Sequence, residues 1–221
     1  TSSPELITDV NWKLLLACTF GHIFMAKEAL SQGADVNCRR FDYLTPLHIA
    51  AVFLGQKNAM VKLLENGATV NCVDNLNRYP LHYAALQKDI DSATLLLTNG
   101  AHVNVYDTFY ESPLYTSVIR RPFLPMIKLL LFHHGADVNT TDYIGLRTPL
   151  HIAAMIGNIK LVVYLIEKGA DLKRKNSAGH TPIDVAIKCR NFKIARLIES
   201  ILTFLLTFSF NNIFIIKKET I

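Results

Sequence analysis

The sequence predicts an all-α fold, a solenoid of stacked helix pairs, because two series of short segments recur along it with one period. The first series is a proline-centred tetrapeptide. Its copies are Thr45-Pro46-Leu47-His48, Tyr79-Pro80-Leu81-His82, Ser112-Pro113-Leu114-Tyr115, Thr148-Pro149-Leu150-His151 and Thr181-Pro182-Ile183-Asp184. Their prolines lie 34, 33, 36 and 33 residues apart. A period of roughly 20 to 50 residues is the signature of a repeat architecture.

The second series is a Gly-Ala pair that keeps the same period. Its copies recur at intervals of 34, 33, 35 and 34 residues, and Val-Asn follows four of the five after one intervening residue. The pairs are Gly33-Ala34, Gly67-Ala68, Gly100-Ala101, Gly135-Ala136 and Gly169-Ala170. Two independent markers in phase indicate one structural unit copied along the chain.

The clearest unit, 148–170, shows why each copy folds as two helices. Thr148 suits an N-cap and Pro149 the first helical turn, where the missing N–H costs nothing. Gly157 and Asn158 break the first helix, and Gly169 ends the second, because glycine adopts the left-handed backbone conformation without strain. One such pair cannot bury both of its faces, so the repeats must stack on one another.

These segments resemble the ankyrin repeat family, whose unit of about 33 residues carries a Thr-Pro-Leu-His-x-Ala signature. The resemblance covers roughly 11–200 and implies an ankyrin-repeat solenoid of antiparallel helix pairs joined by β-hairpin-like loops. It also implies that the tetrapeptide histidines bind locally to the Thr hydroxyl and the nearby backbone. The predicted repeat domain, 1–200, divides into six repeats at about 11–40, 41–74, 75–107, 108–142, 143–176 and 177–200.

Two repeats depart from the pattern. In the first, Trp12 stands at the position of the signature threonine. In the fourth, the segment 120–125 contains two prolines and adds two residues between the predicted helices. Proline cannot extend a helix interior, so we expect the fourth repeat to be the least stable of the stack.

Charge and cysteine content narrow the class of partner and the compartment. Residues 1–156 carry 12 Lys or Arg against 13 Asp or Glu, whereas 157–200 carry 9 against 4. This basic end could steer an acidic partner, but no nucleic-acid motif accompanies it, so we do not expect nucleic-acid binding. Cys38 and Cys72 sit one repeat apart, too far for a disulfide, and reduced thiols suggest the cytoplasm or the nucleus.

The sequence shows no pattern typical of an enzyme, a cofactor site or a metal centre. His48, His82 and His151 are its most regular titratable residues, yet each belongs to a repeat tetrapeptide. No Cys-x-x-Cys, His-x-x-x-His, phosphate-binding glycine loop or Gly-x-Ser-x-Gly elbow is present. We therefore predict a non-catalytic protein without cofactor or metal.

The predicted function is protein–protein interaction, as a scaffold or adaptor. The family binds partners along the concave surface of hairpin tips and first helices. Aromatics and arginines recur at the predicted tips, and such residues are enriched in interface hot spots. The proposed anchors are Phe53, Leu86, Phe109 and Tyr110. Further predicted contacts are Tyr43, Arg78, Tyr143 and Met155. The alternative for several of these apolar residues is packing between neighbouring repeats.

After Ser200 the period stops and an apolar, non-repeat tail follows over 201–221. An apolar helix capping the sixth repeat, a membrane anchor through 201–216 and an aberrant terminus are the alternatives; the uninterrupted apolar run falls short of the about 18 residues a span needs. The chain starts at Thr1 without a signal segment, as a piece of a longer protein would. It could thus be the recognition segment of a larger enzyme or ubiquitin-ligase adaptor, or of a toxin-like or channel-like membrane protein.

Overall fold

The computed structural model describes residues 9–53, 55–119 and 122–218, and over these ranges every regular element is helical. This confirms the predicted all-α class. The chain separates into two compact units, which we call unit 1 (residues 1–143) and unit 2 (residues 144–221).

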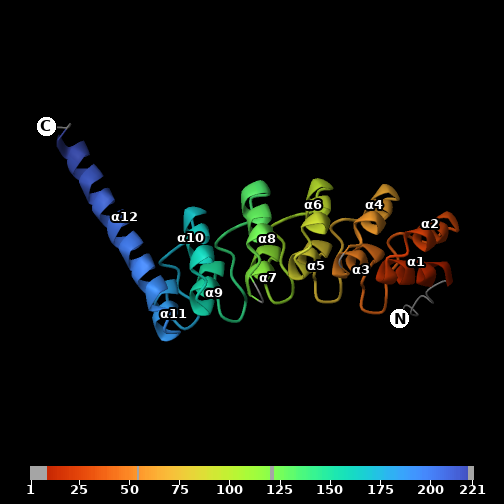
Figure 1. Ribbon diagram of the computed structural model, residues 1–221, viewed down its shortest axis with the longest axis horizontal. Helices are drawn as coiled ribbons and strands as arrows, with labels where there is room; N and C mark the ends of the chain where they lie inside the picture. The colour runs from red at the N-terminus through yellow and green to blue at the C-terminus, as the bar shows by residue number, and fades with distance from the viewer. Residues whose placement is uncertain (1–8, 54, 120–121, 219–221) are drawn as a thin grey trace, which may run out of the picture. The chain divides into compact units, whose positions relative to one another are not determined.

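Unit 1 contains four helix pairs (Figure 1). They are α1 (Asp9–Phe20) with α2 (Ile23–Ser31), α3 (Pro46–Val52) with α4 (Lys57–Glu65), α5 (Pro80–Gln87) with α6 (Ile90–Thr98), and α7 (Pro113–Ile119) with α8 (Leu124–Lys128), which continues as the π-helical turn η1 (Leu129–His133). The first helices of the pairs, α1, α3, α5 and α7, each pack on the next one. The second helices α2, α4 and α6 do the same. The core therefore lies between two layers of helices.

The tetrapeptide forms the start of a first helix, as the sequence predicts, and its histidine also bonds to the next repeat. The side chain of Thr45 accepts a hydrogen bond from the His48 amide, and Pro46 occupies the first turn. The His48 Nδ1 lies 2.9 Å from the Thr45 hydroxyl, and its Nε2–H donates to the Arg78 carbonyl, 2.9 Å away. His82 makes the corresponding bond to the Glu111 carbonyl. The local tie is confirmed, and each imidazole also joins its repeat to the next.

Asparagines after the Gly-Ala pairs form a second set of bonds between repeats. The Asn37 amide donates to the Gly67 carbonyl, and its oxygen accepts from the Thr69 amide at 2.8 Å. Asn71 does the same with Gly100 and His102. These side chains give hydrogen-bond partners to backbone groups that no helix satisfies, where one second helix ends and the next hairpin begins.

The extra residues of the fourth repeat are not all where the sequence placed them. Pro125 lies in the first turn of α8 rather than between the helices. One additional residue lengthens the connection, and the other lies in η1, where the Ala136 amide reaches back six residues to the Leu130 carbonyl. The same bond in the third repeat, from Ala101 to Leu96, spans five. An inserted residue forms a π-turn because the flanking buried side chains keep their contacts.

The first repeat also begins differently from its alignment. Helix α1 starts at Asp9, three residues before Trp12, so Trp12 lies inside a helix instead of capping one. Leu14, Leu15, Ala17 and Cys18 form its buried face. The repeat is thus structurally complete although its signature is absent.

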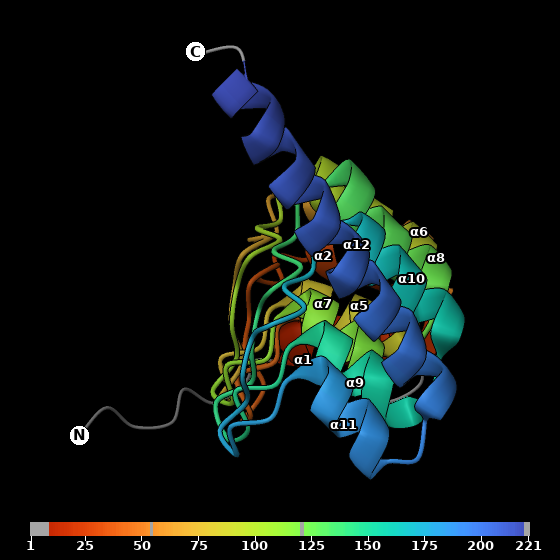
Figure 2. The ribbon, with the colours of Figure 1, turned by 90° about the vertical axis from the view of Figure 1, so that its left-hand side faces the viewer.

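Unit 2 holds two further helix pairs. They are α9 (Pro149–Ile156) with α10 (Ile159–Glu167), and α11 (Pro182–Lys188) with α12 (Phe192–Lys218). Ile194 and Ile198 of α12 are buried, whereas Phe204 and Leu205 are exposed. The tail continues α12 as one helix that runs on past α11 (Figure 2), so it does not fold back as a separate cap. Within the described residues, no helix is long and apolar enough to cross a membrane.

Candidate partner-binding groove

Each hairpin tip has one residue in the left-handed backbone region, three positions before the repeat proline. In unit 1 these are Tyr43 (φ 64°), Asn77 (φ 56°) and Tyr110 (φ 58°). A left-handed conformation favours glycine, and a bulky residue there is strained. Glycine takes the position only at Gly179, in unit 2. The two tyrosines therefore occupy positions that the backbone alone would give to glycine.

A small cavity lies between the third and fourth repeats of unit 1, and it brings three predicted contact residues together. Arg78, Leu86 and Phe109 line it, from a tip, a first helix and the next tip. Its volume is about 100 Å³, below the range of roughly 300 to 1,000 Å³ of small-molecule pockets. It is large enough for one apolar side chain of a partner.

The charged groups at this cavity belong to the fold's own network. The Asp74 carboxylate is buried and accepts a 2.5 Å hydrogen bond from the Tyr83 hydroxyl. It also accepts from the Arg78 Nε at 3.0 Å, and the Arg78 guanidinium lies over the Tyr83 ring. Burial alone would raise the pKa of Asp74, but hydrogen bonds from Tyr83 and two backbone amides hold that pKa below its usual value.

The neighbouring polar residues are also engaged in the fold. One oxygen of Asp107 accepts the backbone amides of Phe109 and Glu111, at 2.8 and 2.9 Å. His82 is buried, which lowers its pKa, and its Nε2–H donates to the Glu111 carbonyl. These groups hold the tip in place, so the surface left for a partner is largely aromatic and apolar.

An aromatic cluster continues from the cavity along the tips. The rings of Tyr110 and Tyr143 are stacked with centroids 5.7 Å apart, and the Tyr106 and Tyr110 centroids are 6.1 Å apart. Phe109, Tyr110 and Tyr143 are 49%, 57% and 68% exposed. Contiguous exposed aromatic area is costly in water and marks an interaction surface. Three of the predicted residues, Phe109, Tyr110 and Tyr143, thus lie together.

The remaining predicted residues do not line this cavity. Tyr43 lies at the first hairpin tip of unit 1. The Arg39 guanidinium lies over the Tyr43 ring, 5.5 Å from the ring centroid. Phe53 ends α3 as its C-cap residue and is exposed. Met155 is exposed on α9, in unit 2.

Sequence reasoning missed several residues of the cavity, although their signal was available. Tyr83, Asp107 and Thr116 line it beside the predicted residues. Asp74 and Asp107 each stand six residues before a repeat proline, and Asn176 has the same place in unit 2. The repeat period would therefore have identified a side chain that accepts hydrogen bonds from the backbone amides of the tip. Across the described ranges, no three His, Cys, Asp or Glu side chains gather as metal ligands.

Comparison with known proteins gives the same architecture. The family model described as ankyrin repeats in three copies matches residues 14–107 and 114–202. The B-cell lymphoma 3 protein homolog of Mus musculus is 32% identical over 76% of this chain. Potassium channel SKOR of Arabidopsis thaliana is 32% identical over 85% of it, and the nuclear factor NF-kappa-B p105 subunit of Gallus gallus 32% over 75%.

The matched region is a minor part of each of these relatives. The chain spans 30%, 22% and 17% of their respective lengths. Their names describe a channel, a lymphoma protein and a nuclear factor subunit. What they share with this chain is the repeat stack, and a shared fold does not transfer a function.

Proposed function

Since this chain belongs to the ankyrin repeat family, we propose that it binds a partner protein along the groove of unit 1, defined by Arg78, Leu86, Phe109, Tyr110 and Tyr143. The observation that carries the proposal is the exposed aromatic cluster at the fourth repeat, beside a cavity sized for one side chain. The histidine and asparagine hydrogen bonds that join the repeats use other side chains, and these aromatics are exposed. They are therefore available to a partner.

Binding is proposed rather than catalysis because the polar groups of the groove are already committed. Asp74, Asp107 and His82 all make hydrogen bonds within the fold. A catalytic acid or base must be free to reach a substrate proton. The groove instead offers exposed aromatic and apolar area, and aromatic residues are enriched in interface hot spots. Because buried free thiols such as Cys18 and Cys72 persist in reducing compartments, we place this interaction in the cytoplasm or the nucleus.

Affinity capture with the whole chain tests the proposal, with quantitative mass spectrometry of the bound proteins. A partner of the groove should be captured by wild type and lost with the double variant Phe109→Ala and Tyr110→Ala. Phe24→Ala is the matched control, since Phe24 is an exposed aromatic of the second-helix layer. A bound set that survives the double variant, or that is lost equally with Phe24→Ala, would refute the groove assignment.

The predicted anchor Phe53 requires its own measurement, because it lies outside the cavity. We propose that it extends the same surface into the second repeat. With the captured partner in hand, Phe53→Ala should weaken the affinity about tenfold, as an interface anchor does. An unchanged affinity would restrict the binding surface to the third and fourth repeats.

A further inference from the structure

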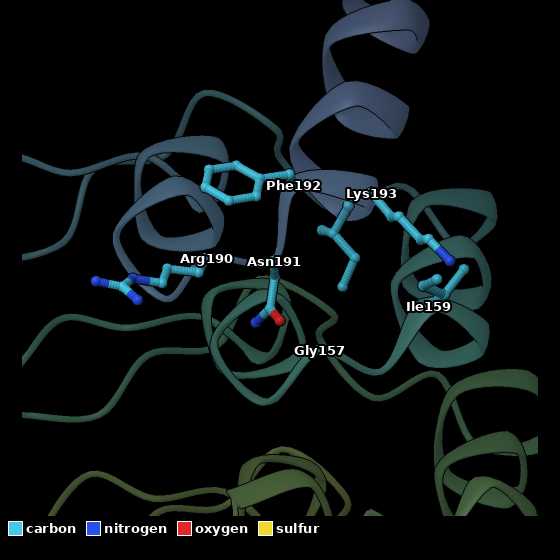
Figure 3. A pocket seen from close by; sticks show the side chains of 7 residues that line it. Gly157, Ile159, Arg190, Asn191, Phe192 and Lys193 are labelled. Carbon is cyan, nitrogen blue, oxygen red and sulfur yellow. The ribbon is translucent and has the colours of Figure 1, made fainter.

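A second and larger cavity lies in unit 2, at the turns that join α9 to α10 and α11 to α12. Its volume is about 420 Å³, within the range of ligand pockets. Figure 3 shows the side chains of Phe192 and Lys193 projecting to opposite sides from the first turn of α12, with Ile159 near the end of Lys193. A first helix starts at the hairpin and ends at this turn, so the cavity lies at the opposite end of the helices from the tips.

The floor of this cavity is fixed in place by one side chain. The Asn191 amide group donates to the Ala154 carbonyl at 2.8 Å and to the Met155 carbonyl at 2.9 Å. Gly157 packs against it so closely that an added Cβ would come 2.9 Å from the Asn191 oxygen. These contacts tie the two turns together, so a ligand would meet a surface that is already formed.

The walls are apolar and partly open to water. Ile194 is buried at the back, whereas Phe192 is 55% exposed and Ile159 is 43% exposed. An apolar side chain from outside could remove both exposed residues from water, at roughly 25 cal/mol per Å² buried.

The rim carries two cations. Neither Arg190 nor Lys193 forms an ion pair with a residue of the described chain. Arg190 lies in the left-handed region (φ 60°), at the position that Gly157 (φ 78°) fills one repeat earlier. A residue other than glycine in this conformation is strained by about 1 kcal/mol or more. Two cations and no carboxylate line the cavity among the described residues, so its rim favours an anionic ligand.

We propose that this cavity binds an acidic peptide segment of a partner protein, with one large apolar side chain between Phe192 and Ile159 and flanking carboxylates at Arg190 and Lys193. The site is separate from the groove of unit 1 and adds to the proposed function. A peptide fits better than a nucleic acid because the walls are apolar and concave. A phosphate backbone would gain from the cations and nothing from the cavity.

Selection from a displayed library of random 12-residue peptides on the whole chain tests the proposal. The enriched peptides should share a Phe, Leu or Trp flanked by Asp or Glu. Fluorescence anisotropy of one enriched peptide then gives the affinity. Arg190→Gly, Lys193→Gln and Phe192→Ala should each weaken it at least fivefold. The double variant Lys173→Gln and Lys175→Gln removes two cations of the hairpin loop and should change the affinity less than twofold.

Stability measurements separate loss of binding from loss of fold. Arg190→Gly relieves the left-handed strain, so its midpoint of thermal unfolding should equal or exceed that of wild type while binding falls. Enriched peptides without the acidic consensus would overturn the proposal. So would variants at Phe192 and Arg190 that bind the peptide as tightly as wild type does. Binding of a 30-nucleotide oligothymidylate that depends on Arg190 but not on Phe192 would show that the ligand is a nucleic acid and not a peptide. Phe109→Ala with Tyr110→Ala should leave peptide binding unchanged, which keeps this site distinct from the groove.

Discussion

The Nε2–H of His48 donates a 2.9 Å hydrogen bond to the carbonyl of Arg78, 30 residues along the chain, so one neutral imidazole joins two repeats. Burial lowers the pKa of His48 to about 4. A lowered histidine pKa means that protonation opposes folding. Stability from His48 is complete above its unfolded pKa of about 6.5 and is lost as the pH falls towards 4.

We therefore expect unit 1 to be destabilised by about 2 kcal/mol between pH 7 and pH 5 through His48 alone. Urea unfolding monitored by circular dichroism at both pH values measures the difference. His48→Gln should be less stable at pH 7 and show a shallower loss on acidification. An equally steep loss in the variant would contradict the assignment.

The buried carboxylate of Asp74 should matter far more than an exposed one. Asp74→Ala removes the partner of Tyr83 and Arg78, and we expect it to cost about 3 kcal/mol, as for other broken buried networks. Asp91→Ala is the control, because Asp91 pairs with Lys57 at 3.3 Å on the surface. That pair should contribute about 0.5 kcal/mol or less. Similar unfolding free energies for the two variants would exclude a structural role for the network.

Tyr110 offers a test with an unusual sign. At most positions alanine is more stable than glycine, but Tyr110 has a positive φ. Tyr110→Gly should therefore be more stable than Tyr110→Ala, by about 1 kcal/mol. Both variants lose the stacking on Tyr143 and should lose partner binding equally. Thermal unfolding of the two proteins gives the comparison, and a more stable alanine variant would show that the tip relaxes to another conformation.

The π-turn η1 provides a prediction for the fourth repeat, which the sequence suggests is the least stable. Amides of 129–136 should exchange with deuterium faster than those of the matching segments in the second and third repeats. Deleting Phe132 should restore the five-residue connection and slow this exchange, because Met126, Ile127 and Leu130 stay buried. Uniform protection across the repeats, or faster exchange after the deletion, would show that the π-turn is not the weak point.

Repeat positions were predictable because proline and glycine have strong local effects. Thr45-Pro46 and Gly67 each fix a helix end, so the period alone located most helices. The left-handed state of Tyr43 and Tyr110 was not predictable, since local propensity argues for glycine there and only the hairpin geometry imposes it. The tail was left open between alternatives for a related reason. The repeat pattern stops at Ser200, but no helix-ending residue follows to stop α12.

The two cavities illustrate the same limit. Arg78, Leu86 and Phe109 were predicted from residue type and repeat position, and the fold brings them together. The cavity of unit 2 was not predicted, because Gly157 and Asn191 each have an ordinary role at a helix turn. Only their contact across two repeats, Asn191 to the Ala154 carbonyl, forms its floor. Such contacts depend on packing between copies, which a reading of one copy at a time does not include.

The inserted residue in η1 leaves the next turn undisturbed. Beyond it, the Asn104 amide still donates to the Gly135 carbonyl, and its oxygen still accepts from the Asp137 amide at 2.8 Å, as Asn71 does one repeat earlier. One residue added near the end of a second helix is thus absorbed inside that helix, and the hydrogen bonds of the turn that follows are formed as in the shorter copy.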